Sequence, residues 1–336
     1  MDNVASKAEE ERPTKWYGQS TSRKEIPLGE LRDALPEFEL RTFGKGSNSN
    51  PYMRQIVRLA FGKDNREIPV SAVSDRYALI QHKSLASWLS NGVEEFDSDD
   101  DELVAQVIMS EFGERIKLIV PLKKMDRVPV SEDLFEEPNL NIYRPEIEIV
   151  NSVDKTLALS IRIRWRRLIC LNGMFTYNDD RLRLIHNLDW MSKASIPGFI
   201  KDRMSKDSGV FAALELWKSK KISPSQVLDW AEERLRNDSK WTVGNSARVY
   251  SIVSTGYCGR VGKVVGRKAH LSEYTVSQDE KVPGLNIPLK NAYDLAQMLT
   301  WIASDMHSVE MQDETTEDVP RLVEDFLNYS KKLQKS

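Results

Sequence analysis

At 336 residues, the chain is long enough for one large domain or two ordinary ones. Its 40% hydrophobic and 29% charged residues are typical of a folded globular protein rather than a disordered one. The formal net charge of −3 excludes attraction of nucleic acid by the overall field, so such binding would depend on local basic patches. Cys170 and Cys258 follow no disulfide or zinc spacing, and no signal peptide or apolar run of transmembrane length stands out, which predicts a cytoplasmic protein that does not enter a membrane.

The first fifty residues predict a mostly flexible N-terminal arm. They combine charge clusters and scattered prolines with a polar run at Gly44–Pro51, and only Leu28–Leu35 resembles an ordered piece. Trp16 and Tyr17 are unusual in such an arm. We expect them to dock on the body of the protein, with a partner as the alternative.

The next segment mixes strand and helix patterns. Arg76–Gln81 and Arg115–Leu122 each predict a strand, and His82–Asn91 predicts a helix with its leucines and tryptophan on one face. Glu94–Glu102 is strongly acidic, and such runs are usually solvated loops.

Pro145–Met174 reads as a β-hairpin with two contrasting faces. On the return strand, apolar residues alternate with polar ones, so that Arg162 and Arg164 share a face, followed by Arg166 and Arg167. Amphipathic helices are then predicted at residues 209–218, 225–236, 291–307 and 319–333. The fold class is therefore α+β, with an antiparallel sheet in residues 51–180 packed against a mainly helical region in residues 181–336, together one large unit.

The arginine face favours contact with a polyanion. Same-face residues of a strand lie about 6.8 Å apart, and arginine both grips phosphate and stacks on bases. The alternative is an ordinary sheet surface, because a short hairpin loop places Glu148 opposite Arg162 and Glu146 opposite Arg164. That register leaves mainly Arg166 and Arg167 free.

A second basic cluster lies in Tyr257–Lys268. It carries Arg260, Lys263, Arg267 and Lys268 without an acidic residue, and its repeated glycines favour a surface loop that contacts phosphates. The glycine spacing fits neither the nucleotide P-loop nor the dinucleotide fingerprint. A solvated crossover loop is the alternative.

Catalytic patterns are weak. No histidine pairs with another histidine or with a cysteine at metal-ligand spacing, and His186 is expected to pack or cap. Asp179, Asp180 and Asp189 are candidates for Mg²⁺ in a nuclease, although acidic pairs of this kind usually belong to turns. We therefore expect no catalytic residues, no metal and no cofactor.

Three segments resemble one prokaryotic family. They are Glu148–Met174, with Asn151, Ser152, Arg167, Leu168, Ile169, Cys170 and Asn172 matching the pattern; Asn291–His307, matching through Tyr293, Asp294, Leu295, Leu299 and Thr300; and Tyr77–Leu89. The chain resembles the phage/plasmid-like protein family, a domain of unknown function numbered 932, over about residues 70–310. The resemblance implies a mobile genetic element, with DNA transactions and conflict with host defences.

Three functions remain open. The first is a non-enzymatic nucleic-acid-binding protein, accessory to recombination or single-strand annealing, with single-stranded DNA as the partner and Arg162, Arg164, Arg166, Arg167, Arg260, Lys263, Arg267 and Lys268 as the binding residues. The second is a protein-binding factor that blocks or recruits a host defence component or another phage protein. The third is the metal-dependent nuclease. A homo-oligomer is compatible with each.

Overall fold

The computed structural model describes Trp16 and residues 21–44, 46–93, 103–126, 143–167, 181–186, 195–205, 210–262, 269–306 and 308–333. The strands are β1 (Thr21–Pro27), β2 (Phe38–Phe43), β3 (Asn50–Arg58), β4 (Ile68–Ser74), β5 (Val104–Ser110), β6 (Arg115–Pro121), β7 (Tyr143–Ser152), β8 (Leu159–Arg167) and β9 (Arg181–Leu184). The helices are α2 (His82–Val93), α4 (Ile196–Ser205), α5 (Val210–Ser219), α6 (Pro224–Glu233), α7 (Val243–Thr255), α8 (Ala292–Ser304) and α9 (Val309–Leu333). Short 3₁₀ turns occupy Gly46–Asn48, Lys123–Met125, Leu235–Asn237 and Leu271–Glu273.

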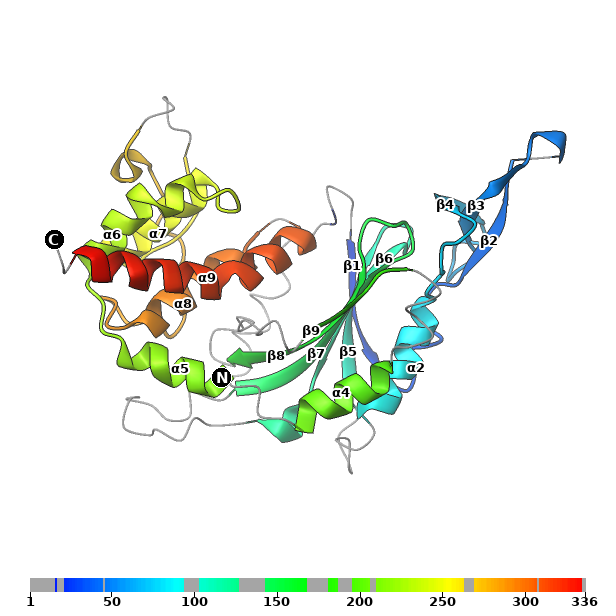
Figure 1. Ribbon diagram of the computed structural model, residues 1–336, viewed down its shortest axis with the longest axis horizontal. Coiled ribbons are helices and arrows are strands. Elements are labelled where there is room, and N and C mark those ends of the chain that lie inside the picture. Colours follow the sequence, from blue (N-terminus) through cyan, green and yellow to red (C-terminus); the bar gives the residue numbers. More distant parts are fainter. Residues whose placement is uncertain are drawn as a thin grey trace.

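Six strands form one antiparallel sheet in the order β1-β5-β6-β7-β8-β9 (Figure 1). Alternation along the strands gives this sheet two different faces. One face buries aliphatic side chains such as Leu118, Ile149 and Ile161 against α2 and α4. These two helices approach closely, because a Cβ at Gly92 would lie 2.9 Å from the Cδ1 atom of Ile200. The apolar face therefore forms a conventional core.

The opposite face of the sheet carries charges. Lys117, Glu148 and Arg162 point from it, and the first half of α9 covers them. A small apolar cluster accompanies these charges and includes Trp16, which is fully buried. The expectation that Trp16 docks on the body is confirmed, whereas Tyr17 lies outside the described residues.

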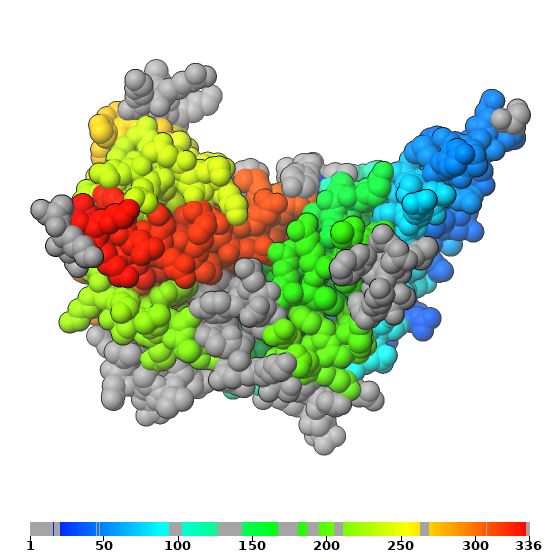
Figure 2. All heavy atoms as spheres, in the orientation of Figure 1, coloured from blue at the N-terminus to red at the C-terminus, as the bar shows by residue number. Residues whose placement is uncertain are grey.

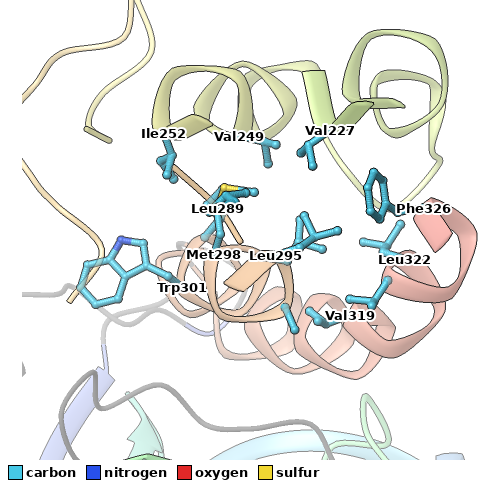
Figure 3. Packing of buried hydrophobic residues seen from close by; sticks show 14 of the residues in the cluster. Val227, Val249, Ile252, Leu289, Leu295, Met298, Trp301, Val319, Leu322 and Phe326 are labelled. Atoms are coloured by element: carbon cyan, nitrogen blue, oxygen red, sulfur yellow. The ribbon is translucent and has the colours of Figure 1, made fainter. Parts of the chain in front are cut away.

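The helical half has its own core. Side chains from α6, α7, α8 and the second half of α9 converge there, as Figure 3 shows for Val249, Leu295 and Phe326. Tyr143 and Trp165, at the ends of β7 and β8, join this core and connect it to the sheet. No helix among the described residues combines the length and apolar character needed to cross a lipid bilayer.

Strands β2, β3 and β4 form a separate three-stranded sheet, which we call the arm. The arm projects from the body at the end opposite the helical half (Figures 1 and 2). Its base is anchored by Phe38, Ile56 and Val73, which pack on Val153. Its outer part exposes Tyr52 and Phe43.

The α+β fold class is confirmed, and so is the cross-strand register of the hairpin. Two parts of the expected flexible arm form strands instead, because Thr21–Pro27 pairs with β5 and Phe38–Phe43 pairs with β3. The ordered piece expected at Leu28–Leu35 is confirmed, since its leucines are buried in the core of the large sheet. Arg76–Gln81 forms no strand beyond an isolated bridge at Tyr77. Helix α9 begins at Val309, ten residues before the predicted start. The acidic run Glu94–Glu102 lies outside the described residues.

Candidate functional site: an arginine face closed by a helix and a groove beside it

Arg162 lies at the centre of a buried group of charges. Its guanidinium pairs with Glu148 of β7 and with Asp313 and Glu317 of α9, and the Asp313 contact measures 2.6 Å. Lys117 lies 2.9 Å from Glu148 and 2.7 Å from Asp313, so the two cations share both carboxylates. Only 4% of the Arg162 side chain is exposed. We call Lys117, Glu148, Arg162, Arg164, Asp313 and Glu317 the ionic seam.

The remaining strand arginines are also paired. Arg164 lies 2.5 Å from Glu148, and Arg166 lies 2.8 Å from Glu146. In both pairs the glutamate lies on β7, two residues from the position directly opposite the arginine. Both side chains are 13% exposed. Arg162, Arg164 and Arg166 therefore do not form an open surface in this structure, because strand carboxylates pair with all three and α9 also pairs with Arg162. Binding of nucleic acid by these residues stays a prediction. Arg167 ends β8, and its side chain lies outside the described ones.

Neighbouring opposite charges favour the ionised forms of Glu148 and Arg162. Burial alone would raise the pKa of Glu148, but Arg162, Lys117 and Arg164 hold it well below the usual range of glutamate. Burial alone would lower the pKa of Arg162, but Asp313, Glu148 and Glu317 raise it above its ordinary value. Charges buried to this extent are tolerated only while each keeps its partner.

In the second basic cluster, at Tyr257–Lys268, one glycine serves main-chain packing and one arginine is exposed. Arg260 is exposed, and its main-chain N–H donates to the Ser277 hydroxyl at 2.8 Å. A Cβ at Gly259 would lie 2.4 Å from the carbonyl oxygen of Ser277, so this glycine is required by the close approach of two main-chain segments. Arg260 stays available for binding, whereas Lys263, Arg267 and Lys268 lie outside the described residues.

A hydrogen-bonded chain, the Tyr77 relay, runs beneath the arm. The Tyr77 hydroxyl donates to Nδ1 of His186 at 2.5 Å, and Nε2 of His186 donates to Oδ1 of Asn151 at 3.0 Å. The Asn151 amide donates to Nδ1 of His82 at 3.2 Å, and Nε2 of His82 donates to the Gly113 carbonyl at 2.9 Å. The Asn151 amide nitrogen also donates to the Ile80 carbonyl, so its Oδ1 faces His186 and accepts from Nε2. A neutral His186 then accepts at Nδ1, which makes the Tyr77 hydroxyl the donor.

The relay acts as a structural clasp. It joins the segment after β4, the end of β7, the start of α2 and the second residue after β9. The Tyr77 hydroxyl also lies 3.1 Å from the Val153 carbonyl, and burial raises the pKa of Tyr77, so a phenolate is disfavoured there. His186 packs as the sequence predicted.

An open groove lies beside the clasp, at the β9 edge of the large sheet, with a volume of about 610 Å³. We call it the β9 groove, and it is lined by Tyr77, Lys155, Thr156, Leu157, Ala158, Arg183, Ile185 and His186. Lys155 and Arg183 are exposed, and neither makes an ion pair with any residue that the structure describes. Ile185 is 69% exposed beside them. Sequence reasoning missed this site because its residues come from three separate segments.

No group of histidine, cysteine, aspartate and glutamate residues within the described parts of the chain could hold a metal ion. Asp179, Asp180 and Asp189 lie outside those parts, so the nuclease hypothesis stays a prediction.

Comparisons with known proteins found no matching family model, no similar curated protein and no similar solved structure. The resemblance to the phage/plasmid-like protein family therefore stays a prediction from the residues that carry it.

The two histidines of the clasp make stability depend on pH. Burial lowers the pKa of His82 and of His186 from 6.5 to about 4, whereas both protonate near pH 6.5 in the unfolded chain. Each neutral histidine contributes about 3 kcal/mol to the free energy of unfolding. This contribution is complete above pH 6.5 and is lost as the pH falls toward 4. We expect urea unfolding of a His82→Gln, His186→Gln variant to lose less stability over this interval than the parent protein. Parallel losses in both proteins would contradict the assignment.

The ionic seam predicts a large penalty for neutralising its central carboxylate. Glu148→Gln leaves Lys117, Arg162 and Arg164 short of a buried counter-charge, and we expect unfolding free energy to fall by about 3–5 kcal/mol. The control is Glu37→Gln, which breaks a surface pair with Lys83 and is expected to cost less than about 1 kcal/mol. Chemical denaturation measures both, and equal losses would show that the seam contributes no more than a surface pair.

Proposed function

We propose that the protein is a non-enzymatic nucleic-acid-binding protein and that it contacts single-stranded DNA through the β9 groove. The observation that carries the proposal is the pair of exposed cations, Lys155 and Arg183, on an open groove that also presents apolar surface. Cations supply the contacts to phosphate, and apolar or aromatic surface accommodates unstacked bases. Duplex DNA presents no unstacked bases, so the apolar floor favours a single strand.

The backbone at Lys155 supports a functional role for this residue. Lys155 has a φ angle of 69°, in the left-handed region that favours glycine or asparagine. A non-glycine residue in this region costs about 1–2 kcal/mol. A lysine at this turn therefore supports a function for its side chain, since a glycine there would relieve the strain.

The resemblance to the phage/plasmid-like family supports the same reading. A protein of a mobile element that binds single strands would be accessory to recombination or strand annealing in the cytoplasm of its host. Arg260 is a further exposed cation and lies in the helical half.

Neutralising the groove tests the proposal. We expect a Lys155→Gln, Arg183→Gln variant to bind a dT oligonucleotide more weakly, with the slope of log K against log salt reduced by about 1.4, or about 0.7 for each lost phosphate contact. The control is Lys24→Gln with Arg32→Gln, which removes two exposed cations near the opposite, β1 edge of the sheet. Fluorescence anisotropy across a salt series gives the slopes. Identical slopes for the groove variant and the parent would exclude the groove as the binding site.

A second candidate function is favoured by the arm. Tyr52 is 75% exposed and Phe43 is 36% exposed on a sheet that projects from the body (Figure 2). Aromatic side chains are enriched at protein interfaces, so the arm fits a factor that blocks or recruits a host protein.

Capture from bacterial lysate distinguishes the two functions. If the arm binds a protein, a partner should survive nuclease treatment and should be lost with Tyr52→Ala plus Phe43→Ser. It should be retained with Phe112→Ser, which removes an equally exposed phenylalanine from the turn between β5 and β6. Retention by the arm variant, or recovery of nothing but nucleic acid, would contradict protein binding by the arm.

A further inference from the structure

Helix α9 consists of two halves with different partners. Its second half places Val319, Leu322 and Phe326 in the core of the helical region (Figure 3). Its first half, Val309–Asp318, lies over the charged face of the sheet, toward which the N-terminal end of the helix reaches in Figure 1. The first half has fewer apolar contacts, through Val309 beside Trp16 and Met311 on the helical core, and Asp318 at its end pairs with Lys240.

The two halves meet at a proline. Pro320 lies inside the helix and has no N–H to donate to the Thr316 carbonyl. Prolines at such positions are the usual cause of helix kinks, because they remove one hydrogen bond of the ladder. The junction between the sheet-facing half and the core-facing half is therefore the weakest point of the helix.

The first half contacts the sheet mainly through carboxylates. Glu310, Asp313 and Glu317 recur at helical spacing and face the strands. Asp313 reaches Lys117 and Arg162, and Glu317 reaches Arg162 and, at 2.6 Å, Arg181 of β9. A guanidinium binds phosphate in the same bidentate way as it binds carboxylate, so these contacts are ones that a nucleic-acid backbone could replace.

A cavity of about 270 Å³ remains between this half of α9 and the sheet. Arg162, Arg181 and Arg183 line one side of it, and acidic residues of α9 line the other. Arg183 and the turn residues 156–158 line both this cavity and the β9 groove. A strand bound in the groove would therefore reach the edge of the covered arginine face.

We propose that Val309–Asp318 is a lid hinged at Pro320, whose acidic face occupies the arginine face as an internal polyanion until single-stranded DNA displaces it. The lid itself follows from the contacts of α9, whereas the identity of its ligand rests on the proposed function. Opening releases Lys117, Arg162 and Arg181 from the α9 carboxylates, so the binding surface enlarges once a strand is bound. The helical core and the second half of α9 stay in place.

Hydrogen exchange of the full chain tests the lid without any ligand. We expect amides of residues 310–318 to exchange at least about tenfold faster than those of residues 322–330, because local opening needs less free energy than global unfolding. Pro320→Ala restores the missing donor and should slow exchange in the first half only. Exchange of both halves as one cooperative unit, unchanged by Pro320→Ala, would overturn the lid.

Binding of a dT oligonucleotide tests what the lid covers. Asp313→Asn with Glu317→Gln should tighten binding about tenfold and steepen the salt slope by about 2, since three further cations become available at about 0.7 each. The control is Glu30→Gln with Glu324→Gln, an equal change of charge at exposed sites away from the seam. Unchanged affinity in a folded lid variant would overturn displacement by DNA.

The two experiments also separate this inference from the proposed function. A lid that opens in hydrogen exchange, in a protein that binds no oligonucleotide with or without the lid carboxylates, would refute the proposed function and the ligand while leaving the hinge established. Groove-dependent binding without independent opening of residues 310–318 would refute only the lid.

Discussion

Charge neutralisation at the face of the large sheet determines how the two halves of this protein fit together. Lys117 of β6 and Arg162 and Arg164 of β8 converge on Glu148 of β7, the strand between them, and Glu148 alone cannot neutralise all three in a buried site. Helix α9 supplies the missing carboxylates through Asp313 and Glu317. The helical half is therefore placed over the sheet by ionic contacts at one end and by apolar contacts through Tyr143 and Trp165 at the other.

The same constraint separates cations that serve the fold from cations that are available to a ligand. Arg162, Arg164 and Arg166 are paired and nearly buried, whereas Lys155 and Arg183 stand in an open groove. The Tyr77 relay ties together the segments that form the groove walls, and its neutral histidines keep this junction free of competing charge. A hydrogen-bonded clasp beside an open groove is compatible with the proposed binding of single-stranded DNA.

Much of the fold could be predicted from the sequence because apolar periodicity marks it. The two faces of the hairpin followed from alternation along its return strand, its register followed from the assumption of a short loop, and α6 and α8 followed from their apolar stripes. The first half of α9 was missed because carboxylates, not apolar side chains, face its partner. Strands β1 and β2 were missed because their pairing partners are distant in sequence, and edge strands carry weak patterns. The groove escaped prediction for a similar reason, since Tyr77, Lys155 and Arg183 meet only through the tertiary fold.

A double-mutant cycle between Arg162 and Glu317 measures the central contact most directly. Arg162→Met, Glu317→Gln and their combination are compared with the parent protein by urea unfolding. The structure predicts a coupling free energy of about 1.5 kcal/mol, as for close charge pairs, because the Arg162 partner is buried. Additive effects within about 0.5 kcal/mol would contradict the account, because they would mean that α9 is not held to the sheet by this pair.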